Sequence, residues 1–358
     1  MNSIEVLDIS KSQIWSNLLK QLPLNLQDIY YTPEYYKVYE NYGDGKAFCF
    51  VYHSGNNLAL YPFLLNRIND FGYDLNKSYY HIEGAYGYNG VVSSSEDTDF
   101  IKSFYTHFNK YCEENNIVAE FTRFHPLLEN YKFSRDFLDI IYNRKTVYVD
   151  LTQGYDEIYK NYSSSQKEGL SKARKKNLTV SFFQNEYPYQ KEFVRMYREN
   201  MKRVKANQYL YFNDVYFDTA FKNLPIIQFV AFKEQIMIAS FLCLLKNSYL
   251  HGYLSASREE YLKFKPNNLL YDEVINFCYK NGLIKVHFGG GRSNSEEDSL
   301  LKFKNSFSKS TADFYIGKKI HNEKIYDEVI RQWEMKNPKN CEISKNILLR
   351  YKNDYEEL

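Results

Sequence analysis

Two apolar runs, Ile227-Gln228-Phe229-Val230-Ala231-Phe232 and residues 236–245, are separated only by Lys233-Glu234-Gln235. Apolar runs that flank a short polar turn are typical of a β-hairpin, so this stretch predicts two antiparallel strands. The sequence that follows predicts a strand at 249–255, a helix at 268–281 and a strand at 284–288. Because a helix joins the last two strands, we expect a right-handed crossover and a mixed sheet.

The first part of the chain shows the same order of elements. A hairpin is expected at 47–53 and 58–65, then a strand at 79–83, a helix at 97–114 and a strand at 118–124. Matching elements are offset by roughly 165 to 180 residues, which indicates a tandem duplication rather than a short-period solenoid. The sequence therefore predicts an α/β (α+β) protein of two tandem units, each a mixed β-sheet flanked by helices. The expected domains are residues 1–150 and 151–358.

Further helices are expected in the second unit at 155–176, 190–205 and 214–222, and a charged helical tail is expected on the surface from Asn322. No linker rich in Gly, Pro or Ser separates the units, so we expect them to pack closely.

The composition narrows the class of protein. The formal charge of +2 gives no global field for nucleic acid, and DNA is not an expected partner. Five dispersed cysteines form no C-x-x-C pair, which favours a reducing compartment. No signal peptide is recognised, and the longest apolar run is about half the length of a membrane span. We expect a soluble, cytoplasmic protein; peripheral contact with the inner membrane surface stays open.

A lysine on an apolar helix face is the main candidate for catalysis. Val286-His287-Phe288-Gly289-Gly290-Gly291-Arg292 reads as a buried strand and a turn, and Leu300-Leu301-Lys302-Phe303-Lys304-Asn305-Ser306-Phe307 as a short helix. Lys304 shares a helix face with Phe303 and Phe307. Its ammonium either reaches out to water along the surface or stays beside the strand end, where it can stabilise the oxyanion of an acyl transfer.

The three glycines do not form a nucleotide loop, because no G-x-x-x-x-G-K-[ST] pattern is present. Glu296, Glu297 and Asp298 are expected in the first turn of the following helix, where they disfavour a bound anion. The glycines are therefore expected to permit a tight turn or a close approach of substrate to the backbone.

Two helices carry basic residues. Lys167, Lys172, Arg174, Lys175 and Lys176 crowd the end of one, and Arg195, Arg198, Lys202 and Lys205 form a stripe on another. They are either solvated faces or contacts for a phosphate-bearing ligand, such as a nucleotide diphosphate, a tRNA acceptor end or anionic lipid headgroups.

In the first unit, Arg123 and His125 lie at the end of the strand predicted at 118–124. Either they contact a ligand in the crevice of the sheet, or they lie on a loop and form their hydrogen bonds within the protein. Seven histidines form no H-x-H, H-x-x-x-H or H-E-x-x-H pattern, so no metal site is expected.

An ordered set of short motifs resembles the FemAB-like branch of the GNAT acyltransferase superfamily, best known for peptidoglycan-bridge aminoacyltransferases. The resemblance covers nearly the whole chain. Its motifs are Thr32-Pro33-Glu34-Tyr35, Gly87-Tyr88-Asn89-Gly90, Arg123-Phe124-His125-Pro126-Leu127-Leu128-Glu129-Asn130, Lys172-Ala173-Arg174-Lys175, Tyr197-Arg198-Glu199-Asn200-Met201-Lys202-Arg203 with Ala206 and Tyr211-Phe212, Pro266-Asn267-Asn268-Leu269-Leu270, Phe288-Gly289-Gly290-Gly291 and Phe303-Lys304.

The resemblance implies two GNAT-like units and transfer of an acyl or aminoacyl group to an amino group of a cell-envelope precursor, for peptidoglycan or surface polysaccharide. It implies that Lys304 is the catalytic residue that stabilises the tetrahedral intermediate. The candidate substrate-binding residues are Tyr88, Arg123, His125, Lys175, Arg198, Lys202, Arg203, Tyr253, Asn267, Arg292 and Phe303. The acceptor would be a small molecule or a nucleotide-linked sugar or peptide, and no bound cofactor is expected.

Two departures from the family bear on the donor, which is either aminoacyl-tRNA or acyl-CoA. The long coiled-coil arm of some members has no room here, so tRNA docking of that style is not expected. The acetyl-CoA loop Q/R-x-x-G-x-G/A is replaced by Arg258-Glu259-Glu260-Tyr261-Leu262-Lys263, which lacks a glycine. Two alternatives stay open: an acyl-CoA-dependent N-acetyltransferase of a nucleotide-linked amino sugar, and a non-catalytic protein that binds a glycan or nucleotide sugar.

Overall fold

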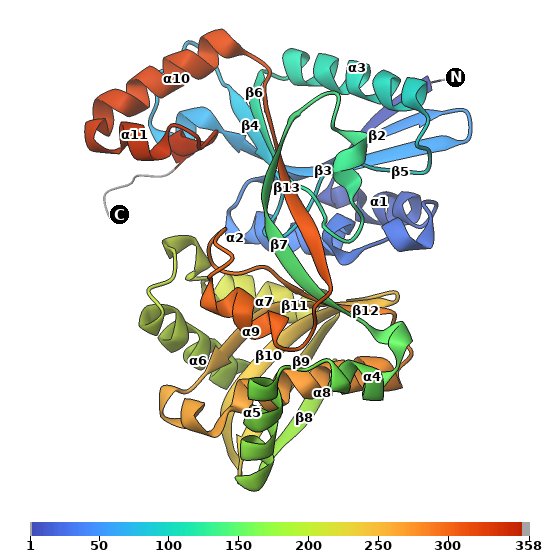
Figure 1. Ribbon diagram of the computed structural model, residues 1–358. Coiled ribbons are helices and arrows are strands. Elements are labelled where there is room, and N and C mark those ends of the chain that lie inside the picture. Colours follow the sequence, from blue (N-terminus) through green and yellow to red (C-terminus); the bar gives the residue numbers. More distant parts are fainter. Residues whose placement is uncertain (1, 353–358) are drawn as a thin grey trace. The chain divides into compact units, whose positions relative to one another are not determined.

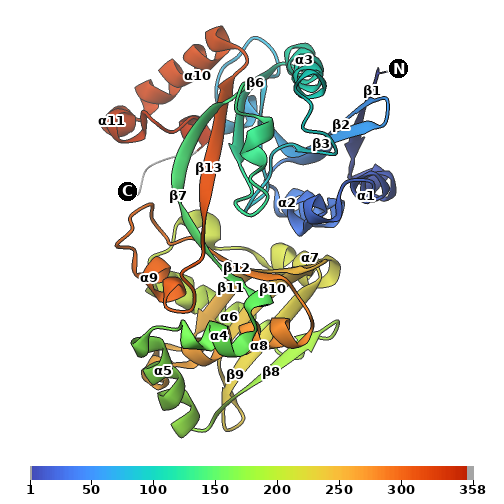
Figure 2. The ribbon, with the colours of Figure 1, turned by 45° about the vertical axis from the view of Figure 1, so that its right-hand side comes forward.

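The structure is a computed structural model that describes residues 2–352, and these residues form two compact units (Figure 1). Unit 1 comprises residues 2–143 and 314–352, and unit 2 comprises Arg144–Asp313. The chain enters unit 2 within β7 (Asp139–Asp150) and returns to unit 1 within β13 (Thr311–Ile320). These two strands are neighbours in the sheet order, and Figures 1 and 2 show them side by side.

Unit 1 is built on a mixed sheet in the order β1-β2-β3-β4-β6-β13. Its strands are β1 (Asn2–Asp8), β2 (Lys46–Ser54), β3 (Asn57–Arg67), β4 (Tyr80–Glu83) and β6 (Ile117–Arg123), with the short β5 (Val92–Ser93) paired to β3. The β2–β3 hairpin is antiparallel, as predicted. β4 and β6 are parallel and are connected through α3 (Thr98–Glu114), which confirms the predicted crossover.

Aromatic side chains fill the core of unit 1. On one side of the sheet, Phe50 of β2 packs against Phe104 and Phe108 of α3. The remaining helices of the unit are α1 (Ser12–Leu19), α2 (Pro33–Tyr42), α10 (Glu323–Lys336) and α11 (Cys341–Ser344).

The strands of unit 2 pair as a mixed sheet in the order β7-β12-β11-β10-β9-β8. Its strands besides β7 are β8 (Leu178–Gln184), β9 (Ile226–Lys233), β10 (Ile236–Lys246), β11 (Tyr249–Ser257) and β12 (Lys285–Gly289). The β9–β10 hairpin is antiparallel, and β11 and β12 are parallel and are joined through α8 (Pro266–Lys280). The predicted hairpin and crossover are both confirmed.

Helices cover both faces of the sheet of unit 2. Phe229 of β9 contacts Phe277 of α8, whereas Phe232 of the same strand contacts Tyr189, which precedes α6 (Gln190–Arg203). Residues three apart on a strand point to opposite faces. α8, with α4 (Tyr155–Lys160) and α5 (Ser164–Lys175), therefore lies on one face, and α6 with α7 (Asp214–Asn223) lies on the other.

The prediction of one continuous helix at 155–176 is wrong, because the structure has two helices there, α4 and α5. The helical stretch is interrupted at 161–163, and α5 begins anew because the Ser163 side chain accepts a hydrogen bond from the backbone N–H of Gln166.

The domain boundary at residue 150 also differs from the structure. The chain leaves unit 1 near Asn143, inside β7, and residues 314–352 belong to unit 1 instead of unit 2. The reason is hydrophobic: Val329 and Trp333 of α10 are fully buried against Val118 of β6. The C-terminal helix expected as a charged surface element is therefore part of a core.

Replacing Trp333 with Ala tests this assignment. We expect a loss of about 3–5 kcal/mol in unfolding free energy, because a fully buried indole leaves a large cavity. Hydrogen–deuterium exchange should show reduced protection in peptides of unit 1, including 117–123, more than in peptides of unit 2. Met335→Ala on the same helix is the control, since Met335 is 75% exposed. Equal loss of protection in both units would contradict the assignment.

Candidate active site

The parallel strands β11 and β12 separate where the candidate site lies. They pair through only three residue pairs, of which the last is His251 with His287. β11 then continues to Ser257 along β10, while β12 continues to Gly289 along β7. Beyond the last pair the backbones of the two strands no longer pair with each other. Backbone groups released from a ladder in this way can bind an extended ligand.

Lys304 lies at the end of the separated β12. It is on α9 (Ser299–Asn305), its residue is only 7% exposed, and its Nζ donates a hydrogen bond of 2.6 Å to the carbonyl oxygen of Gly290. Gly290 directly follows β12. Lys302 on the same helix is exposed and forms an ion pair with Glu297. The alternative in which Lys304 reaches out to water is therefore wrong.

The surroundings of Lys304 favour loss of its proton. Burial lowers the pKa of Lys304 from the ordinary 10.5 to about 7, the carboxylate of Asp298 opposes this shift, and the guanidinium of Arg144 adds to it. Near neutral pH both the ammonium and the amine are thus populated.

Asp298 organises the turn between β12 and α9. One carboxylate oxygen accepts from the N–H groups of Leu300 and Leu301 at the start of the helix. The other accepts from the N–H groups of Arg292 and Ser293 in the turn. Partial burial alone would raise the pKa of Asp298, but these N–H groups outweigh it and lower the pKa to about 2.

This arrangement corrects one prediction and explains the glycines. Glu296 and Glu297 precede the helix, so Asp298 alone complements its first turn. A Cβ on Gly291 would lie 2.5 Å from Oδ1 of Asp298, and Gly289 has a φ of +73°. The turn therefore requires glycine at Gly291 for the close carboxylate and at Gly289 for its backbone conformation.

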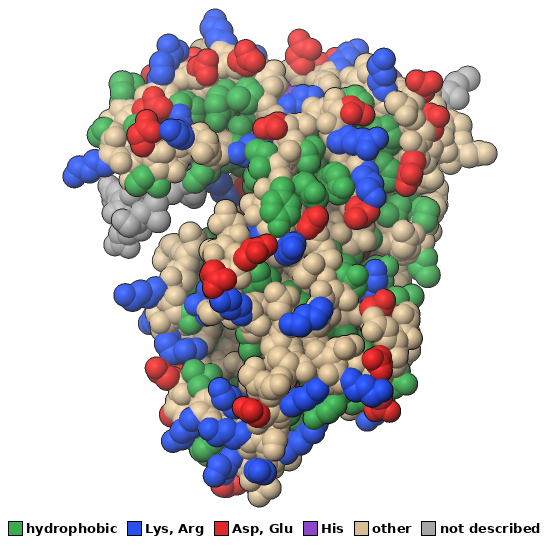
Figure 3. Space-filling model, in the orientation of Figure 1, with side chains coloured by type: hydrophobic (Ala, Val, Ile, Leu, Met, Phe, Trp, Pro, Cys, Tyr) green, Lys and Arg blue, Asp and Glu red, His purple; other side chains and the backbone are tan. Residues whose placement is uncertain are grey.

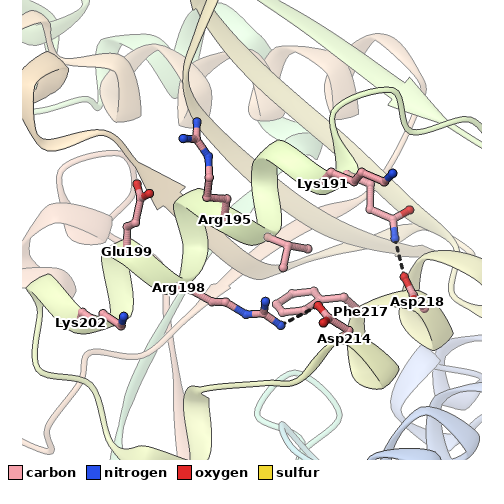
Figure 4. Close-up of a pocket in the computed structure, with 10 residues that line it drawn as sticks. Lys191, Arg195, Arg198, Glu199, Lys202, Asp214, Phe217 and Asp218 are labelled. Carbon is pink, nitrogen blue, oxygen red and sulfur yellow. Dashed lines mark hydrogen bonds and ion pairs between the residues drawn. The ribbon is translucent and has the colours of Figure 1, made fainter.

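A pocket of about 640 Å³ lies between α6 and α7 (Figure 4). Its polar lining includes four cations on α6, Lys191, Arg195, Arg198 and Lys202, and three carboxylates, Glu199, Asp214 and Asp218. Arg198 reaches across to α7, where it forms an ion pair of 2.8 Å with Asp214. Arg195 is 61% exposed and lies 3.8 Å from Glu192. Three residues of the predicted basic stripe, Arg195, Arg198 and Lys202, therefore line a real hollow, whereas its fourth residue, Lys205, is outside the lining. Arg203 is also outside the lining and bonds to Asn200.

The basic end of α5 lies on the opposite face of the sheet. Lys172 and Lys175 are exposed there, and Figure 3 shows Lys and Arg side chains gathered over α5 in the lower part of the view. Arg174 has a structural role, because it pairs at 3.0 Å with Asp272, which is buried on α8. The two basic helices of unit 2 therefore do not form one surface.

Residues 192–299 match the model of the acetyltransferase (GNAT) domain. This range contains the separated strands β11 and β12, and Lys304 follows it closely. Residues 192–299 are a GNAT acyltransferase domain.

Solved structures extend the similarity to both units. The crystal structure of FemX has a TM-score of 0.65 at 13% identity, over 90% of this chain and 99% of FemX. L-PGS from Bacillus licheniformis has a TM-score of 0.56 at 12% identity, over 86% and 91%. A tandem GNAT protein from the clavulanic acid biosynthesis pathway has a TM-score of 0.51 at 7% identity, over 89% and 98%. The predicted tandem-GNAT fold is thus confirmed, and the FemAB-like resemblance holds for the fold. No curated protein matches the sequence.

The other candidate residues of unit 2 spread around the GNAT domain. Arg292 is exposed in the glycine turn, and Phe303 packs its ring against Tyr271 at 5.1 Å. Asn267, in the first turn of α8, accepts from the Ser257 hydroxyl at 2.7 Å. Tyr253, on β11 beyond the separation, has its hydroxyl bonded to that of Tyr216 on α7. Arg292 and Phe303 are thus close to the turn that holds Lys304.

The candidate residues of unit 1 form a group of their own. Tyr88 and His125 pack their rings at 5.1 Å, and His125 Nδ1 accepts from the N–H groups of Leu127 and Leu128. His125 Nε2 lies 3.6 Å from Asp28, a buried residue that no sequence signal had singled out. Arg123 donates to the carbonyl oxygen of Gly84 at 3.1 Å, so it holds the loop that carries Tyr88.

Within the described residues, no helix is long and apolar enough to cross a membrane.

Replacing Lys304 with Met should stabilise the fold at pH 7. The pKa of Lys304 is about 7 in the folded state, whereas the ordinary value of 10.5 applies in the unfolded state. The unfolding free energy of the native protein therefore rises as the pH increases from 7 to 10.5. Below pH 7 the lysine is charged in both states, and burial of the ammonium then lowers the unfolding free energy by its full amount. Below pH 7 we expect Lys304→Met to raise the unfolding free energy by on the order of 2 kcal/mol, with the loss of the hydrogen bond to Gly290 already included.

Urea unfolding at several pH values checks this expectation. The gain should shrink from pH 7 to pH 10.5, whereas the exposed control Lys302→Met should change little at any pH. A Lys304→Met protein that is equally destabilised at pH 7 and pH 10 would refute the burial of a charge at this position.

Proposed function

We propose that this protein transfers an acyl or aminoacyl group to an amino group of a cell-envelope precursor. The observation that carries this proposal is the buried ammonium of Lys304 at the end of β12, beside the point where β11 and β12 separate. The GNAT domain at 192–299 supports acyl transfer, and the FemX-like and L-PGS-like fold supports an aminoacyl donor.

In this proposal Lys304 polarises the donor carbonyl. The acceptor amine attacks the carbonyl carbon, the new C–N bond forms, and negative charge develops on the carbonyl oxygen. The ammonium of Lys304 donates a hydrogen bond to that oxygen, and burial strengthens the interaction because water does not screen it. The intermediate then collapses, the bond to the leaving group breaks, and the amine proton passes to the leaving group directly or through water.

The structure offers no glycine loop for the pyrophosphate of coenzyme A after β11. A 3-10 helix (Glu259–Phe264) occupies this position, and its Tyr261 and Phe264 pack against the core of unit 2. Glu259 and Glu260 are exposed there and would repel a coenzyme A pyrophosphate at this position. These features favour aminoacyl-tRNA over acyl-CoA as the donor.

The pocket between α6 and α7 is the proposed site for phosphates of the donor or the acceptor. Lys191 and Lys202 line it, and among the described residues no hydrogen bond or ion pair of their side-chain ammonium groups is found. Cations that are not neutralised by the protein remain available to an anionic ligand. α5 lies on the other sheet face and is a weaker candidate.

A donor panel tests the function. The protein is incubated with aminoacyl-tRNA or acetyl-CoA, each with amino sugars, nucleotide-linked sugars and envelope peptides, and products are identified by mass spectrometry. We expect product with aminoacyl-tRNA. Product only with acetyl-CoA would support the alternative N-acetyltransferase, and saturable binding of an acceptor without product from any donor would contradict an enzymatic function.

In the same assay Lys304→Ala should lower turnover by about two to three orders of magnitude, because an oxyanion contact is lost. The fold should persist, as judged by circular dichroism. Lys302→Ala is the matched control on the same helix and should keep near-normal turnover. Near-normal turnover of Lys304→Ala would reject its catalytic role.

Reversing charge in the pocket should weaken substrate binding. We expect Lys202→Glu to raise KM about tenfold, or ~1.4 kcal/mol, with little change in kcat, and to reduce the dependence of KM on salt. Lys172→Glu, an exposed reversal on α5, is the control. Equal effects of the two reversals would show that the pocket has no special role and that only overall charge matters.

A further inference from the structure

Lys304 and its partner Gly290 close a ring of the chain. The hydrogen bond joins residues 14 apart in sequence, so the end of β12, the glycine turn and α9 form a loop that returns on itself. Asp298 lies inside this ring and binds its two halves together. It accepts from Arg292 and Ser293 on the turn side at 3.1 Å each, and from Leu300 on the helix side at 2.9 Å.

Arg144 of β7 holds the same turn from the neighbouring strand. Its Nη1 donates to the carbonyl oxygens of Gly291 at 3.1 Å and Ser293 at 3.0 Å. A Cβ on Gly290 would lie 3.0 Å from Cδ of Arg144, so the arginine packs directly on the residue that binds Lys304. One carboxylate and one guanidinium therefore fix the turn from two sides.

We propose that Asp298 and Arg144 are positioning residues that hold the glycine turn and α9 so that the ammonium of Lys304 faces the end of β12. They also act on that ammonium with opposite charges. This proposal rests on the proposed function of Lys304, and it adds two residues that the sequence motifs do not mark. Neither residue needs to touch substrate.

Other charged groups near the ring point to solvent. Lys302 on α9 pairs with Glu297, Lys145 on β7 lies 3.9 Å from Glu296, and Arg292 in the turn is exposed. Burial is the main cause that lowers the pKa of Lys304, and Asp298 and Arg144 are the charges that act on it, in opposite directions. These two charges therefore adjust, in opposite directions, the fraction of ammonium that burial leaves near neutral pH.

Two variants should move the titration of Lys304 in opposite directions. Asp298→Asn removes the favourable negative charge and should lower the midpoint by about 0.5–1 pH unit, and Arg144→Gln removes the unfavourable positive charge and should raise it by a similar amount. A purely structural role would not give shifts of opposite sign. Because catalysis uses the ammonium, the fall in kcat/KM at alkaline pH should follow the same midpoints.

The experiment uses two readouts on the full-length protein. The first is the pH dependence of Lys304 acetylation by acetic anhydride, quantified by mass spectrometry of its peptide, which needs no enzymatic activity. The second is the pH profile of kcat/KM with the donor and acceptor found in the panel. Glu297→Gln removes a carboxylate of the same loop that pairs with the exposed Lys302, and it should leave both midpoints unchanged.

Arg144→Lys separates charge from hydrogen bonding. It keeps the positive charge but not the paired contacts to Gly291 and Ser293, so we expect a native-like midpoint with lower kcat. Unchanged midpoints in Asp298→Asn and Arg144→Gln, or shifts of the same sign, would overturn the proposal. Opposite shifts in acetylation together with full turnover of Lys304→Ala would uphold the electrostatic pair and overturn the proposed function instead.

Discussion

One buried ammonium imposes most of the local structure around the candidate active site. Lys304 needs a hydrogen-bond acceptor inside the protein, and the carbonyl oxygen of Gly290 provides it. That contact requires a turn that brings α9 back over the end of β12, so glycine stands where Asp298 and Arg144 approach the backbone. The triple glycine, which lacks the pattern of a nucleotide loop, therefore serves the turn that brings Lys304 to Gly290.

The separation of β11 and β12 places this arrangement where a substrate can reach it. Among the described strands of unit 2 they are the only parallel neighbours, and their pairing ends after His251 and His287. β10 and β7 continue to pair with their outer edges, so each strand stays ordered after they part. The sheet thus offers backbone groups at an interior position, and α9 adds the buried ammonium of Lys304 beside them.

The sequence predicted what local periodicity encodes. The hairpins, the crossovers through α3 and α8 and the tandem repeat are confirmed, because alternating and helical patterns mark them residue by residue. Contacts between distant segments were not predictable in this way. Trp333 is buried in the same hydrophobic cluster as Val118, which lies more than two hundred residues away in the chain. Arg144 of β7 donates a hydrogen bond to the glycine turn. Asp298 was noticed as an acidic residue near a helix start, but its bonds to the turn required the fold.

Basic residues show why composition alone is a poor guide to function in this chain. Arg174 neutralises the buried Asp272, Arg198 bridges two helices through Asp214, and Lys304 is buried with a carbonyl oxygen as its partner. The first two ion pairs satisfy charge within the protein. Lys304 instead keeps a cation whose main cost, desolvation, is offset only in part by Asp298. A site that stabilises an oxyanion needs such an incompletely compensated charge. A lysine that is fully neutralised by the protein would give the transition state little electrostatic stabilisation.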